Sequence, residues 1–285
     1  MRNARYLRPT GLDDALAALA AERWTIVAGG TDHYPARVGQ PLDEDLLDIT
    51  GIAALSEIRR EERHWRIPAL VTWSEIIADR SLPPLFDGLK LAAREVGGVQ
   101  IQNAGTLCGN LCNASPAADG APNLLALDAE VELASQRGVR QLPLEAFLTG
   151  NRKTVRAPDE LMTAILVPDT GRRARSTFLK LGARRYLVIS IVMVGAVITL
   201  DAGGRIASAG IAVGACAPVA KRLPALELDL IGQKPGVELA RRVAAEHLAP
   251  LSPIGDVRGT ADYRRHALGV LARRMLTWAL ESTCA

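Results

Sequence analysis

The sequence contains no long hydrophobic run. Its most extended apolar stretch, residues 187–200, is interrupted by serine, glycine and threonine, and it is shorter than the roughly 20 residues that a membrane-spanning helix needs. Because valine and isoleucine dominate this stretch, we expect a buried β-strand there. The first nine residues form no apolar segment of the kind that a secretion signal contains. These absences predict a cytoplasmic protein without a membrane span.

Cysteine and histidine are also scarce. The chain has four of each in 285 residues, and the spacing of the cysteines shows no disulfide framework, as is typical of a reducing compartment. Cys108 and Cys112 are separated by three residues, but no further cysteine or histidine lies near them in the sequence to complete a metal site. We therefore predict no metal centre, and we identify no serine–histidine–aspartate or paired-carboxylate arrangement for catalysis.

No charge of one sign is concentrated along the chain. The 34 basic and 31 acidic residues leave a formal net charge of +3, and the arginines occur as scattered pairs without interleaved aromatic residues. A nucleic-acid-binding surface normally needs a basic run or stripe. Nucleic acid is therefore not an expected partner.

Glycine and small polar residues, in contrast, gather in two loops. The first has the sequence IVAGGTD at residues 26–32, and the second spans residues 97–119. Glycine lets backbone N–H groups approach a phosphate closely, and two such loops about 75 residues apart suggest one dinucleotide held from two sides. Neither loop has the G-x-G-x-x-G or G-x-x-x-x-G-K-[ST] signature of Rossmann and P-loop proteins. The alternative from the residues alone is a pair of tight turns with helix caps.

The loops also carry side chains that suit a nucleotide. Hydroxyl and amide groups can bind phosphate oxygens, and an acidic residue after each loop can accept hydrogen bonds from ribose or ribityl hydroxyls. These residues are Thr31, Thr106, Asn110, Asn113, Asp32 and Asp119.

Hydrophobic periodicity predicts helices and strands along the whole chain. Residues 10–13 have the pattern of a capping box with Thr10 as N-cap, so a helix is expected to follow, with Leu12, Ala15, Leu16 and Leu19 on one face. Further helices are expected from residue 72 and at residues 85–96, 123–127, 236–247 and 262–281. Strands are expected at 24–28, 46–49, 65–71, 130–133, 161–167, 177–181, 190–200 and 206–213, the last two joined as a hairpin. The polar segment 169–173 is the predicted main boundary.

Several of these segments together resemble the FAD-binding medium subunit of the xanthine dehydrogenase and carbon monoxide dehydrogenase family, the molybdenum hydroxylases. The motifs occur in the same order and span nearly the whole chain. They are AGGTD (28–32), N-x-G-T-x-x-G-N (103–110), ASPAAD (114–119), LALDA (125–129), F-x-K-x-x-x-R (178–184) and SPI-x-DVRG-x-A-x-YR (252–264).

The resemblance implies an α+β fold in three parts. Two small α/β FAD-binding subdomains of the PCMH type, residues 1–55 and 56–170, are expected to hold FAD between them. An α+β C-terminal domain, residues 174–285, is expected to pack behind them with an antiparallel sheet and helices.

The resemblance also implies which residues contact FAD. The first loop would bind the diphosphate, and the second would complete the diphosphate, ribityl and adenosine contacts. A later methionine and lysine would lie near the flavin ring, where a positive charge stabilises the reduced anion. The expected cofactor-binding residues are Val27, Ala28, Gly29, Gly30, Thr31, Asp32, His33, Gly105, Thr106, Gly109, Asn110, Cys112, Asn113, Ala118, Asp119, Met162 and Lys180.

As a member of this family, the chain would receive electrons from 2Fe–2S clusters on a small partner subunit, which takes them from a molybdenum cofactor on a large partner. FAD would pass them to NAD, oxygen, a quinone or another acceptor. Two alternatives remain open: a stand-alone flavin oxidoreductase, and an FAD-free scaffold paralogue. Cys108 favours the scaffold, because it stands where the family has glycine. A cysteine with positive φ would be strained there, and its side chain would crowd the cofactor.

Overall fold

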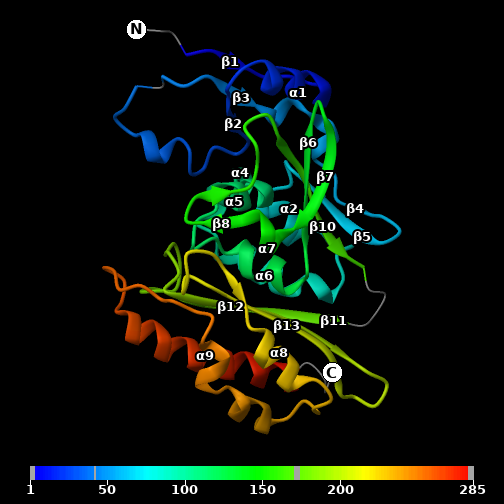
Figure 1. Ribbon diagram of the computed structural model, residues 1–285, viewed down its shortest axis with the longest axis vertical. Helices are drawn as coiled ribbons and strands as arrows, with labels where there is room; N and C mark the ends of the chain where they lie inside the picture. Colours follow the sequence, from blue (N-terminus) through cyan, green and yellow to red (C-terminus); the bar gives the residue numbers. More distant parts are fainter. Residues whose placement is uncertain (1–3, 42, 170–173, 282–285) are drawn as a thin grey trace.

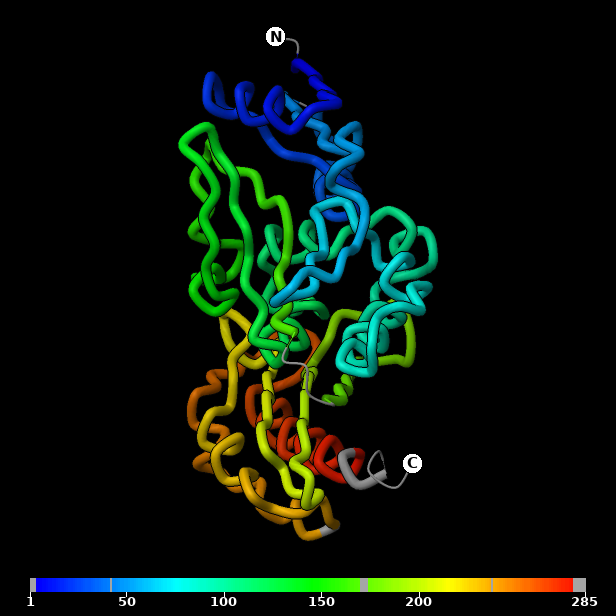
Figure 2. Tube along the Cα trace, turned by 90° about the vertical axis from the view of Figure 1, so that its right-hand side faces the viewer, coloured from blue at the N-terminus to red at the C-terminus, as the bar shows by residue number. Residues whose placement is uncertain are grey.

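The chain is stacked in three parts along its long axis. The computed structural model describes residues 4–41, 43–169 and 174–281, and Figure 1 shows the N-terminal part at the top, the middle part below it and the C-terminal part at the bottom. Figure 2 shows the same order after a quarter turn. Most of the expected boundary segment, residues 170–173, and Cys284 lie outside the described residues.

The first part is a small parallel sheet with one helix. Its strand order is β1-β3-β2, formed by Tyr6–Leu7, Leu46–Asp48 and Thr25–Val27. Helix α1, Leu12–Ala21, buries three of the four side chains expected on its inner face. The predicted capping box is wrong, because the N-cap is Gly11 and has no side-chain cap hydrogen bond. The helix begins one residue later than expected, which moves Asp13 out of the position from which it could complete the box.

The second part is a five-stranded antiparallel sheet surrounded by short helices. The strand order is β4-β5-β10-β6-β7, formed by Arg59–Arg60, His64–Pro68, Leu161–Pro168, Glu130–Ser135 and Gly138–Pro143. The helices are α2 Trp73–Ala78, α3 Asp87–Glu95, α4 Val99–Ala104, α5 Leu107–Asn113, α6 Gly120–Ala126 and α7 Leu144–Phe147. As expected, a helix begins after Thr72, with a complete Thr72–Glu75 capping box, and α3 ends before Gly97, whose φ is +52°. A two-stranded hairpin, β8 Leu148–Gly150 and β9 Lys153–Thr154, follows α7.

The third part is a four-stranded antiparallel sheet with helices on both faces. Strands β11 Ala174–Leu181, β12 Val192–Leu200, β13 Ile206–Gly214 and β14 Lys221–Arg222 lie in sequence order. Helices α8, Pro224–Leu230, and α9, Ala261–Glu281, cover the lower face of the sheet in Figure 1, and α6 lies against the upper face. None of the helices in the described part of the chain has the length and hydropathy needed to cross a membrane.

Two predictions of secondary structure need correction in this part. The apolar run from residue 187 does not begin a strand: Leu187 has φ of +53°, and Arg184 donates hydrogen bonds to the carbonyls of Tyr186 and Leu187, which holds the segment as a loop. The expected helix at 236–247 is replaced by two 3₁₀ segments, Val237–Arg242 and Ala245–Leu248. The chain is extended between them, and hydrophobic periodicity over so few residues does not distinguish a 3₁₀ turn from an α-helix.

Glycines let helix α6 pack directly on the C-terminal sheet. A Cβ added to Gly210 of β13 would overlap the carbonyl oxygen of Ala126, and one added to Gly195 of β12 would lie 2.9 Å from the backbone nitrogen of Asn123. Since α6 follows the second glycine loop, this contact fixes the end of that loop relative to the C-terminal sheet.

Substitution Gly210→Ala is expected to lower the free energy of unfolding by about 1–3 kcal/mol, because the added methyl group overpacks a backbone contact. Urea unfolding followed by circular dichroism measures the change. Gly236→Ala is the matched control, since the backbone there is extended and the nearest atom lies 3.7 Å from an added Cβ. Equal stability of the two variants would contradict this account of the packing.

Candidate functional site

The first glycine loop presents a row of unpaired backbone N–H groups. It follows β2, whose last residue, Val27, is buried. Gly30 has φ of +64°, and its carbonyl accepts a hydrogen bond from the Tyr34 N–H at 3.1 Å. Within residues 4–41, 43–169 and 174–281, the N–H groups of residues 29–33 donate to no protein acceptor. Successive free N–H groups around a left-handed residue form a concave anion-binding site, which fits a diphosphate.

The two glycine loops touch each other through their main chains. A Cβ added to Gly29 would overlap the carbonyl oxygen of Ala104, and one added to Gly105 would lie 3.2 Å from the hydroxyl oxygen of Thr31. Glycine is the residue that permits so close an approach. The structure therefore brings Ala28–Thr31 and Gly105 together, although they are far apart in the sequence.

The second loop is held by helix caps and side-chain contacts. The Thr106 hydroxyl accepts a hydrogen bond from Gly109 N–H at 3.0 Å, which caps helix α5. Asn110 Oδ1 accepts a hydrogen bond from Gly120 N–H at 3.3 Å, which connects α5 to α6. Thr106 therefore caps a helix, as the alternative interpretation of the loops expected. Gly105, the residue before it, contacts the first loop at Thr31.

Cys108 lacks the positive φ that the family's glycine at this motif position suggested. It lies in helix α5 with no positive φ, its side chain is buried, and its Sγ is 4.0 Å from the carbonyl oxygen of Ile67. Burial raises the pKa of this thiol. The expected strain and crowding are therefore wrong: the thiol packs in the core between α5 and β5, and it no longer supports a loss of cofactor binding.

Cys112 and Met162 lie side by side. Cys112, at the exposed side of α5, has its Sγ 3.8 Å from the Met162 sulfur. Met162 is buried in β10 where the pairing register with β6 shifts.

No cluster of three or more His, Cys, Asp or Glu side chains suited to a metal occurs among the residues that the structure describes.

Asp119 and Lys180 form a buried ion pair between the second and third parts. Lys180 Nζ lies 2.9 Å from Asp119 Oδ2, and the Ser190 hydroxyl donates to Asp119 Oδ1 at 2.9 Å. Lys180 Nζ also donates to the Glu95 carbonyl at 3.2 Å. Burial raises the pKa of Asp119, although Lys180 and Ser190 act in the opposite direction. Both carboxylate oxygens thus have protein partners, and the pair anchors the end of the second loop to β11.

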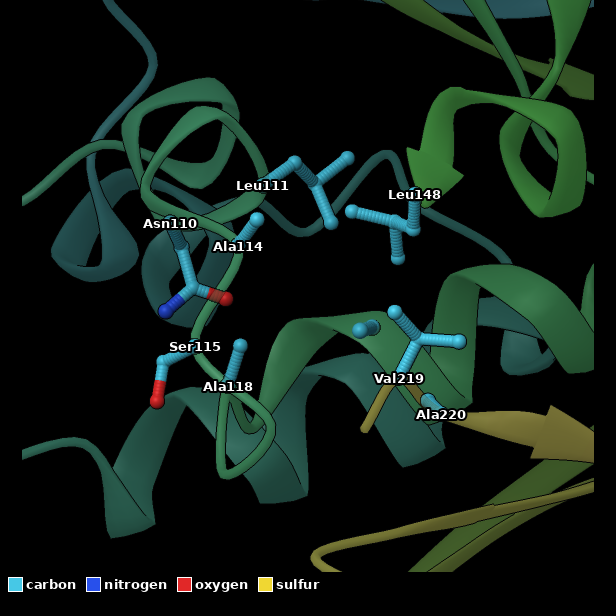
Figure 3. Close-up of a pocket in the computed structure, with 9 residues that line it drawn as sticks. Asn110, Leu111, Ala114, Ser115, Ala118, Leu148, Val219 and Ala220 are labelled. Atoms are coloured by element: carbon cyan, nitrogen blue, oxygen red, sulfur yellow. The ribbon is translucent and has the colours of Figure 1, made fainter. Parts of the chain in front are cut away.

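Small residues line a cavity behind the second loop. Its volume is about 10 Å³, which is enough for roughly one water molecule. Figure 3 shows it between Asn110, Ala114, Ser115 and Ala118 on one side and Leu148 and Val219 on the other. A ligand of dinucleotide size therefore has to lie along the outer surface of the loops rather than in this cavity.

One residue of the site was missed by the sequence analysis. Arg152, in the turn of the β8–β9 hairpin, lies with its Nη1 2.9 Å from Asp32 Oδ2 and also donates to Asn113 Oδ1. The sequence around Arg152 predicts only a polar turn, and no local pattern indicates that this turn lies beside the two loops.

His33, the neighbour of Asp32, is partly buried with its Nε2 3.7 Å from Glu44.

The environment of His33 keeps this imidazole neutral near pH 7. Burial, followed by the nearby Arg37 charge, lowers its pKa, and Glu44 offsets only part of that effect. His33 therefore adds no positive charge to the first loop at that pH.

Substitution Lys180→Met is expected to destabilise the fold by about 3 kcal/mol or more, because it leaves a buried carboxylate without its counter-charge. Arg265→Met is the control: Arg265 forms an exposed ion pair with Asp262 at the same 2.9 Å distance, and such pairs contribute about 0–1 kcal/mol. Urea unfolding at pH 7 measures both variants. A Lys180→Met protein as stable as the wild type would refute the structural importance of the buried pair.

Family models match both halves of the chain. Residues 2–170 match the FAD binding domain in molybdopterin dehydrogenase, and residues 177–279 match the CO dehydrogenase flavoprotein C-terminal domain. The first match alone covers more than half of the sequence, and it includes both glycine loops.

Individual relatives agree with these matches. The xanthine dehydrogenase FAD-binding subunit of Escherichia coli O157:H7 is 28% identical over 97% of this chain and 96% of its own length. The nicotinate dehydrogenase FAD-subunit of Eubacterium barkeri is 33% identical over 72% of this chain and 71% of its own. A chain of carbon monoxide dehydrogenase from Hydrogenophaga pseudoflava superposes with a TM-score of 0.87 at 28% identity, covering 100% of this chain and 99% of that one. The chain belongs to the family of FAD-binding subunits of the molybdopterin dehydrogenases, which are subunits of oxidoreductase complexes.

Proposed function

We propose that this chain carries electrons through FAD from a 2Fe–2S partner subunit to an electron acceptor. The 2Fe–2S clusters would lie on a small partner, and a large partner with a molybdenum cofactor would oxidise the substrate. Bound FAD supplies one-electron and hydride chemistry, so NAD, oxygen, a quinone or another acceptor can take the electrons. The chain itself would bind and orient FAD between the units formed by residues 1–55 and 56–170.

The observation that carries this proposal is the row of free N–H groups at residues 29–33. None of these five residues is fully buried, so their N–H groups, which follow one another around Gly30, are open to an anionic ligand. The second loop lies directly against them at Ala104 and Gly105. FAD with its diphosphate at the first loop could therefore extend along the second loop toward Asn113 and Asp119.

The flavin end of the ligand is expected toward Met162 and Lys180. Met162 is buried directly behind Cys112, and Lys180 supplies a fixed positive charge at the junction with the third part. A positive charge near the ring stabilises reduced flavin. Because Lys180 is already paired with Asp119, its effect on the flavin is expected to be smaller than that of a free lysine.

Substitution Gly30→Ala is expected to weaken FAD binding about tenfold or more, equivalent to about 1.4 kcal/mol. An added Cβ would lie 2.5 Å from the Tyr34 ring and would distort the row of N–H groups. Gly39→Ala is a matched control, because Gly39 also has positive φ, of +77°, but open space around it. Titration of the apoprotein with FAD, followed by flavin fluorescence, measures both affinities. Equal losses would show that backbone strain, not the anion site, governs binding.

The partner proposal is tested by purification of the tagged chain from its native host. We expect a small chain with 2Fe–2S clusters and a large chain with molybdenum to copurify, identified by mass spectrometry and metal analysis. The isolated chain is expected to oxidise no organic substrate, since the proposed large partner carries out that oxidation. Turnover of an organic substrate by the isolated chain would instead favour a stand-alone flavin oxidoreductase.

A further inference from the structure

Arg152 connects the two glycine loops from a third segment of the chain. Its Nη1 lies 2.9 Å from the Asp32 carboxylate at the end of the first loop and donates to the Asn113 amide oxygen at the end of α5. The Arg152 and Asp32 side chains are 59% and 54% exposed, so the pair contributes little to folding stability. The contacts of Arg152 with both glycine loops point instead to a role in ligand binding.

The backbone holds Arg152 in place independently of its side chain. The Arg152 N–H donates to the Ala114 carbonyl at 2.8 Å, and both residues have left-handed backbone conformations, with φ of +54° and +48°. Non-glycine residues adopt this conformation at a cost, and in a tight hairpin turn such as this one it is required. The backbone of the turn that carries Arg152 is therefore constrained, and the guanidinium group reaches Asp32 from this turn.

Asp32 presents an electrostatic problem at this position. Its own N–H is one of the five free donors of the first loop, yet its carboxylate would repel a diphosphate bound there. The nearest arginine in the sequence, Arg37, pairs instead with Glu44.

We propose, on the basis of the proposed FAD function, that Arg152 is a positioning residue that neutralises Asp32 so that the free N–H groups can hold a diphosphate. Arg152 acts through Asp32 and not as a direct ligand of the phosphate. The residue thus makes the first loop compatible with a bound diphosphate, while the main chain makes the contacts.

The test is a double-mutant cycle on the full chain with FAD as the probe. Arg152→Met is expected to weaken FAD binding about tenfold, because an uncompensated carboxylate remains beside the diphosphate. Asp32→Asn keeps an oxygen that can accept a hydrogen bond from a ribose or ribityl hydroxyl but removes the negative charge, so it is expected to bind FAD more tightly than the wild type. The Asp32→Asn, Arg152→Met double variant is expected to recover to within about threefold of the wild type, since removing both charges removes the repulsion. Affinities are measured by fluorescence titration at fixed ionic strength.

The cycle distinguishes this inference from simpler roles. If Arg152 binds the phosphate directly, Arg152→Met loses the same affinity with or without Asp32, and the inference is overturned. If Arg152 only fastens the loops, both single variants weaken binding and the double variant does not recover, which also overturns it. A wild-type chain that binds no FAD would overturn the proposed function, and this inference with it. Arg241→Met, which removes an exposed arginine in the C-terminal part, controls for net charge, and urea unfolding shows that each variant is folded.

Discussion

The contact between the main chains at Gly29 and Ala104 is the constraint on which the site depends. At this point the first loop, from the small parallel sheet, lies directly on the second, from the helices of the middle part. Any side chain at Gly29 would separate them. The close approach joins two turns into one surface, and the N–H groups of residues 29–33, which have no protein partners, belong to the first of these turns. Both parts of the molecule therefore contribute to the surface that carries the free donors.

A second close approach extends this surface to the C-terminal part. Helix α6 packs on β12 and β13 through Gly195 and Gly210, and the Asp119–Lys180 pair joins the start of that helix to β11. The ion pair is buried, so breaking it by removing one partner is costly. The second loop is therefore held at both ends. A cofactor that spans the two loops would rest on a frame whose geometry the C-terminal sheet helps to set, although that sheet contributes few of the expected contacts.

Charge in the site is arranged mainly in pairs. Asp119 is matched by Lys180 and Asp32 by Arg152, while burial and Arg37 keep His33 neutral at pH 7 by lowering its pKa. With these charges balanced, the partial positive charges of the main-chain N–H groups remain to attract an anion. Cys108, which resembled a defect when only the motif was considered, lies in the core behind this surface. Because the Cys108 side chain faces the core, this departure from the family motif leaves the proposed ligand surface unchanged.

Local sequence patterns were sufficient to predict much of the fold. The short-range signals are the helix start at residue 72, the alternating apolar residues at 130–133, the apolar run at 161–167 and the glycines after α3. The elements lie where these signals place them. Local patterns failed where contacts decide the outcome, as in the loop after Arg184 and the broken segment at 236–247. By itself the sequence determined the two glycine loops, the three-part order of elements and the family. Only the tertiary structure decided that Asp119 pairs with Lys180, 61 residues away, and Asp32 with Arg152, 120 residues away, because such pairings arise when separately folded segments pack and leave no periodic trace in the chain.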